Sequence, residues 1–178
     1  MIDTQATIQD LERITQHYQE ELERFSMEEL TRKPGEEEWS LGQMYMHLIQ
    51  ASLYLHLKNV RTCAASAEGV ITGEEKTERG KAAFAERAFP PIRVQVPPSP
   101  AYTPPQPGSK EQIREGLIHV LAEMRKSEPL VHTAPPENRV IHPGFGALNA
   151  EEWFALIEMH YRHHLRQKER LEDFLAEV

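Results

Sequence analysis

The sequence predicts an all-α protein, a four-helix bundle with a long proline-rich crossover between the second and third helices. Four segments carry apolar residues at steps of three and four, the spacing of a helix that buries one face. No segment has the alternation expected of a strand. Eight prolines fall between residues 90 and 107 and separate the helices into two pairs. Neither pair has enough helices to close a core, so we expect a single domain over residues 1–178.

The first pair of helices is predicted over residues 4–30 and 40–65. In the first helix the apolar stripe runs from Ile8 to Phe25, and Pro34-Gly35 follows as a stop signal. The second helix begins at Ser40, which forms a capping box with Gln43 three residues later. Gln43 is either this cap or a contact for a substrate.

The second pair is predicted over residues 109–128 and 149–176. Ser109 opens the third helix and Glu128-Pro129 closes it. Asn149, with Glu152 three residues later, opens the last helix. Between the pairs we expect a short helical turn over 81–89, followed by an extended, polyproline-like crossover over 90–107.

Composition narrows the functional classes. The 178 residues include 28 acidic and 20 basic side chains, a net charge of −8, which argues against a nucleic-acid partner. The single cysteine, Cys63, allows no intrachain disulfide and is consistent with a cytoplasmic location. The N-terminus lacks the apolar segment of a signal peptide, and no run of about 18 apolar residues predicts a membrane helix.

Three histidines form a candidate metal site. His160 and His164 are four residues apart on the last predicted helix, so both rings project from one face, roughly 40° apart. His47 lies within the apolar stripe of the second helix. Three neutral imidazoles leave a divalent ion open to water or substrate, as in catalytic zinc sites. A single histidine on such a stripe is more often a packed core residue, and that interpretation of His47 stays open.

The remaining histidines are assigned other places. His163 is the nearest competitor, at the edge of the buried face of its helix. His56 lies nine residues after His47, about 180° around an α-helix, so we expect it to face solvent. The others are predicted at the edges of stripes or in loops: His17, His119, His132 and His142.

Two blocks of sequence resemble the DinB/YfiT-like metalloprotein family. Residues 39–48, WSLGQMYMHL, are similar to its W-S-x-x-Q-x-x-x-H-L segment. Its C-terminal block is similar to HPGFGALN at 142–149, followed by Glu152-Trp153 and HYRHHLRQ at 160–167. The proline-rich middle of the chain is unmatched.

The resemblance implies a bundle with right-handed, up-up-down-down-type connectivity and a divalent metal, often zinc or nickel, on His47, His160 and His164. It implies a metal-dependent hydrolase or thiol S-transferase that acts on a small molecule with a low-molecular-weight thiol such as bacillithiol, mycothiol or glutathione. It also implies a homodimer.

The competing hypothesis is a bundle without catalysis, in which the histidines hold a structural metal or form a polar core cluster, or which serves as a dimerisation module. No general acid or base is assigned from the sequence. Glu158 and Tyr161 flank His160, but the helical spacing places both away from the face that carries the three histidines.

Overall fold

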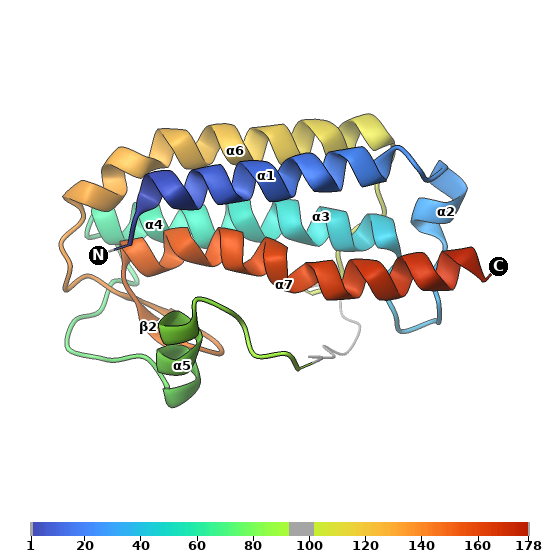
Figure 1. Cartoon of the computed structure of the whole chain (residues 1–178). Helices are drawn as coiled ribbons and strands as arrows, with labels where there is room; N and C mark the ends of the chain where they lie inside the picture. The colour runs from blue at the N-terminus through green and yellow to red at the C-terminus, as the bar shows by residue number, and fades with distance from the viewer. Residues whose placement is uncertain (1, 93–101, 178) are drawn as a thin grey trace.

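The computed structural model describes residues 2–92 and 102–177 and has four long helical segments lying side by side (Figure 1). Helix α1 packs against α6 and α7, and α4 packs against the same two helices. The predicted four-helix bundle is confirmed. The segments are α1 (Thr4–Leu22), the continuous run of α3 (Leu41–Ala51), η1 (Ser52–His56) and α4 (Leu57–Ala64), then α6 (Lys110–Thr133) and α7 (Ala150–Ala176).

The direction of the helices differs from the expected connectivity. Helices α1 and α7 run parallel to each other, and α3–α4 and α6 run the opposite way (Figure 1). The order is therefore up-down-down-up, not up-up-down-down. A long crossover is needed because α4 and α6 are parallel, so the chain must return along the bundle between them. The contacts that fix these directions are Tyr18–Tyr161, Glu21–Lys168, Ile49–Gly116 and Arg61–Glu123.

The first predicted helix, 4–30, is wrong in its second part. Helix α1 ends at Leu22, and a separate short helix, α2 (Met27–Thr31), follows. Ser26 accepts from the Glu29 backbone while the Glu29 carboxylate accepts from the Ser26 backbone, a complete capping box. A capping box starts a helix, because it satisfies backbone N–H groups that have no partner at a helix start. The capping box at Ser26 therefore marks the start of a second helix, α2.

The third predicted helix, 109–128, ends too early. Helix α6 continues through Pro129 to Thr133. Proline removes one backbone hydrogen bond, to the carbonyl of residue 125. Arg125 is on the exposed side, where water can replace that bond. His132 is consequently in the last turn of α6 and not in a loop.

A small hairpin contradicts the expectation that the chain has no strand. Strand β1 (Val140–His142) pairs antiparallel with β2 (Gly146–Leu148), just before α7. Three residues per strand are too few to give a recognisable alternation in the sequence. His142 is therefore in a strand. An isolated bridge between Lys76 and Gly146 joins the hairpin to the segment before α5 (Glu78–Glu86), the helix predicted at 81–89.

The proline-rich crossover is described only at its two ends, because residues 93–101 lie outside the described residues. Its second end is anchored on the start of α3. The Gln43 Nε2 atom donates to the carbonyl of Pro104 at 2.8 Å, and Pro107 packs against Gly42. Gln43 also completes the capping box with Ser40. It is thus a cap that also ties down the crossover.

Helix α5 docks on the hairpin through Gly80, and this gives a stability prediction. A Cβ atom on Gly80 would lie 2.2 Å from the carbonyl oxygen of Phe145. Gly80→Ala would gain about 1 kcal/mol or less in helix propensity. We expect the clash with the Phe145 carbonyl to outweigh this gain, since overpacking costs about 1–3 kcal/mol. Gly108→Ala is the control, since its nearest neighbour would be 3.5 Å away.

Chemical denaturation of the two variants checks this. A Gly80→Ala protein as stable as Gly108→Ala would show that α5 is not held by this close contact.

Among the described residues, no helix is both long enough and apolar enough to cross a bilayer.

Candidate metal centre

Three imidazoles converge between two antiparallel helices, His47 from α3 and His160 and His164 from α7. The Nε2 atom of His160 is 3.0 Å from Nε2 of His47 and 2.9 Å from Nε2 of His164. The three ligand nitrogens all lie within 4.8 Å of one another. The three histidines predicted to meet do meet, and we call them the His triad.

Burial makes the triad neutral near pH 7. It lowers the pKa of His47 to about 4 and that of His164 to about 3. It also lowers the pKa of His160 well below its ordinary value, and the neighbouring imidazoles add to this. His160 is only 8% exposed, whereas His47 and His164 are half-buried. A neutral imidazole has one free lone pair, which is the form that binds a metal ion.

Gln167 fixes the orientation of one ring in the triad. Its Oε1 atom lies 2.7 Å from Nδ1 of His164. A carbonyl oxygen only accepts, so Nδ1 carries the proton and Nε2 keeps its lone pair, aimed at His160. Ligand histidines in metal sites commonly donate the second ring N–H in this way.

The donor set fits a divalent metal ion. Nitrogens on one tetrahedral zinc, at about 2.0–2.1 Å from it, are roughly 3.3 Å apart. The two short Nε2 separations in the triad are 2.9 and 3.0 Å. Imidazole nitrogen suits zinc and nickel alike. Within the described part of the chain, the group within 4.8 Å contains three imidazoles and no carboxylate, which leaves coordination positions for an exogenous ligand.

Aromatic side chains flank the triad. The indole ring of Trp39, just before α3, is 4.9 Å from the ring of His47. The ring of Phe89, just after α5, stacks on His160 at 5.9 Å and lies 5.2 Å from His163. Trp39 and Phe89 are both half-buried, so they cover part of the triad and present part of their surface to solvent.

His56 lies on the opposite side of its helix from the one predicted. It is not solvated but 3% exposed, and its ring lies 5.3 Å from that of His160. The reason is η1, a π-helical turn at Ser52–His56. A π turn holds one extra residue, which rotates the following side chains by about 100°. His56 is thereby turned inward, and its apolar neighbour Leu55 is 39% exposed.

The other candidates lie outside the triad. His163 is half-buried beside it, and His17 and His119 are exposed. His142 accepts at Nδ1 from the backbone N–H groups of Gly144 and Phe145. Glu158 pairs with Arg162 at 2.8 Å, Tyr161 is buried in the core, and burial raises the pKa of the Cys63 thiol to about 11.

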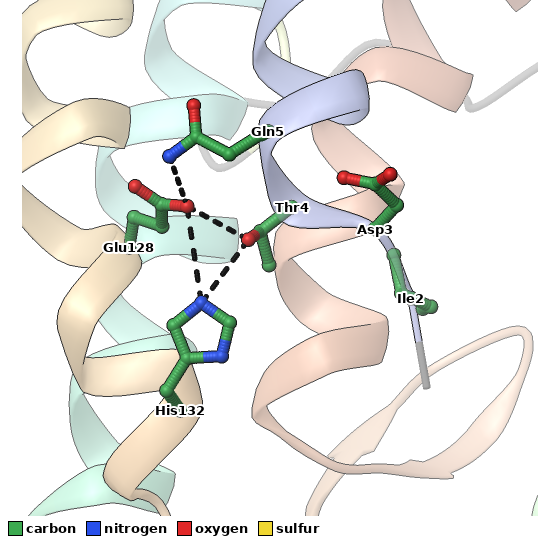
Figure 2. A pocket seen from close by; sticks show the side chains of 6 residues that line it. All are labelled: Ile2, Asp3, Thr4, Gln5, Glu128 and His132. Atoms are coloured by element: carbon green, nitrogen blue, oxygen red, sulfur yellow. Dashed lines mark hydrogen bonds and ion pairs between the residues drawn. The ribbon is translucent and has the colours of Figure 1, made fainter.

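Two cavities lie away from the triad. One of about 540 Å³ is at the start of α1, where Glu128 accepts from Thr4 and Gln5 beside His132 (Figure 2). Its side chains bind one another across α1 and α6, so they join the two helix ends. A second, of about 340 Å³, is lined by residues around the start of α7, including Arg87 and Glu151.

A helical bundle with an inward-facing cluster of three histidines defines the class of this protein. The chain matches the DinB superfamily over residues 10–167 and belongs to that family. Its structure is similar to that of YfiT from Bacillus subtilis, described as a probable metal-dependent hydrolase with an unusual four-helix bundle topology. The TM-score is 0.54 at 15% sequence identity, over 99% of this chain and 91% of that one. No curated protein matches this sequence.

The bond from Gln167 gives a prediction about metal affinity. Gln167→Leu removes the acceptor of the His164 Nδ1–H, and we expect zinc affinity to fall about 10- to 100-fold, as for other such partners. Gln167→Glu keeps an acceptor and is expected to retain the affinity. Competition with a chelator of known affinity measures both. Equal affinity for Gln167→Leu and the wild type would show that this bond does not support the site.

Proposed function

We propose that this chain is a metal-dependent enzyme whose His47, His160 and His164 hold a divalent ion, zinc or nickel. A metal held by these residues would supply the activation of water or of a low-molecular-weight thiol, such as bacillithiol, for hydrolysis or S-transfer on a small electrophilic substrate. The observation that carries the proposal is the convergence of the three Nε2 atoms of neutral imidazole rings. Nε2 of His160 lies 3.0 Å from that of His47 and 2.9 Å from that of His164. Outside a metal site at most one of the two contacts can be a well-formed N–H···N hydrogen bond, because Nε2 of His160 has either one proton or one lone pair for its two neighbours.

When bound, such an ion lowers the pKa of water or a thiol and so supplies a nucleophile near neutral pH. The chain's own residues orient the ligand rings and shield the triad from solvent. Gln167 sets the His164 tautomer, and the half-buried rings of Trp39 and Phe89 reduce access of bulk water to the triad. The same rings offer apolar surface to a substrate. Among the residues that the structure describes, the ligand group has no carboxylate, which is consistent with a nucleophile activated by a bound ion.

Further parts of the proposal rest on the sequence and the family resemblance: one domain over residues 1–178, a cytoplasmic homodimer, and no nucleic-acid partner. The net charge of −8 supports the last of these.

Turnover by the metal-loaded protein tests the catalytic part. Protein loaded with zinc or nickel would be incubated with activated esters, amides and alkylating electrophiles, with and without a thiol. We expect metal-dependent product, with thiol consumption distinguishing S-transfer from hydrolysis, and background rates in His164→Ala. A loaded wild type with four protein ligands and no turnover would favour the structural bundle.

A further inference from the structure

His56 has the burial and position of a functional side chain but no assigned role. It is brought to the triad by η1, which interrupts an otherwise regular α-helix between α3 and α4. Such π turns are rare and occur frequently at functional sites. In a regular α-helix this side chain would point away from His160, so the insertion serves to place it there.

Two neighbouring ring nitrogens lack partners. Among the described residues, five buried side-chain polar atoms have no hydrogen-bond partner, and two of them are Nδ1 of His56 and Nδ1 of His160. The centroids of the two rings that carry them are 5.3 Å apart. Leaving a buried polar atom unpaired costs about 1–3 kcal/mol, so two on neighbouring rings call for an explanation.

The protonation state of His160 determines which hydrogen-bond partner its ring needs. If Nε2 of His160 binds the metal, the neutral ring carries its only proton on Nδ1. That N–H is buried and needs an acceptor. Among ligand histidines this need is nearly always met, as Gln167 meets it for His164.

His56 can supply the acceptor. Its side chain is 3% exposed, and a neutral imidazole has one acceptor nitrogen. Its ring is 5.3 Å from that of His160, with an interplanar angle of 80°. The two pairs with short Nε2 contacts have separations of 4.8 and 4.5 Å and angles of 84° and 78°. The His56–His160 pair thus has the same edge-on ring geometry as the two pairs within the triad.

We propose that His56 is a positioning residue for the metal ligand His160. In the metal-loaded protein Nδ1 of His56 accepts the hydrogen bond from the Nδ1–H of His160, which holds Nε2 of His160 toward the ion. This rests on the proposed metal site and adds to it a fourth histidine that does not touch the metal.

Matched variants test the role through zinc affinity. His56→Phe keeps a buried ring and removes the acceptor, and we expect zinc affinity to fall about 10- to 100-fold. His56→Asn places an amide oxygen near the position of Nδ1 and is expected to restore most of that loss. His142→Phe is the control, because that histidine does not contact a triad ring and its Nδ1 is already bonded to the backbone. Its affinity is expected to match the wild type.

A measurement on the unmutated protein tests the bond itself. In zinc-loaded protein with ¹⁵N-labelled histidine, we expect a protected Nδ1–H proton on His160 and a ¹⁵N–¹⁵N coupling across the hydrogen bond to His56. Because this measurement uses the unmutated protein, it tests the hydrogen bond even where a variant fails to fold.

The outcomes separate the two proposals. A wild type that takes up no zinc removes both the metal site and the role of His56. A wild type that binds zinc, with no coupling and with equal affinity in His56→Phe, removes the role of His56 and leaves the metal site in place. The coupling together with a rescue by His56→Asn supports the role.

Discussion

Replacing any one triad histidine with alanine is expected to lower zinc affinity by roughly two to three orders of magnitude. Structural zinc sites with four ligands bind with about 10–16 kcal/mol, or roughly 2.5–4 kcal/mol per ligand, and each 1.4 kcal/mol is tenfold. His47 stands on a different helix from His160 and His164, so its loss would leave only one helix holding the ion. Chelator competition for the three variants measures the effect.

His163→Ala is the matched control for these variants. It lies on α7 next to His164 but outside the group of converging nitrogens. We expect it to bind zinc as the wild type does. An equal loss in His163→Ala and His164→Ala would mean that the ion does not sit between the triad nitrogens.

The second large effect is loss of stability in acid by the metal-free protein. An unfolded histidine has a pKa near 6.5, whereas burial lowers the pKa of His56 to about 3 in the folded state. Between these values the unfolded chain binds a proton that the folded chain does not, so stability falls as the pH falls. From pH 7 to pH 5 this is about 2 kcal/mol for His56, at 1.36 kcal/mol per unit below pH 6.5.

Other buried histidines act in the same direction, because burial lowers the pKa values of His47, His160 and His164 too. Several such terms together approach the stability of about 5–15 kcal/mol typical of a domain. We therefore expect cooperative unfolding between about pH 6 and 4. Urea denaturation in the presence of a chelator at several pH values measures this. His56→Phe should reduce the pH slope by one proton, and a stability that stays constant from pH 7 to 5 would refute the prediction.

The sequence was sufficient for the four long helices and for the candidate histidines, because both depend largely on local spacing. Helical periodicity identified the four long segments, and the four-residue step from His160 to His164 needs only one regular helix. His47 could be assigned because its α3 segment is regular up to Ala51 and begins at a complete capping box. These features are properties of single helices, whereas the meeting of His47 with the other two histidines was expected from its place in the apolar stripe and from the family resemblance.

The features that could not be predicted depend on irregular backbone geometry or on contacts between segments that are distant in the sequence. No residue pattern in Ser52–His56 announces a π turn, so His56 was assigned the wrong side of its helix. Phe89 reaches His160 only through the docking of α5 on the hairpin at Gly80. Gln167 had a local signal, three residues after His164 and near enough on a helix to bond its ring.

The most direct test of the metal site is the metal content of the protein as purified. Protein without a histidine tag, prepared without chelators, would be analysed by mass spectrometry for the wild type and for His160→Ala. We predict about one equivalent of zinc, nickel or a similar ion in the wild type and none in the variant, as expected for an ion held by so few ligands. A wild type that stays metal-free even after incubation with zinc and nickel would contradict the site and leave the triad as core histidines.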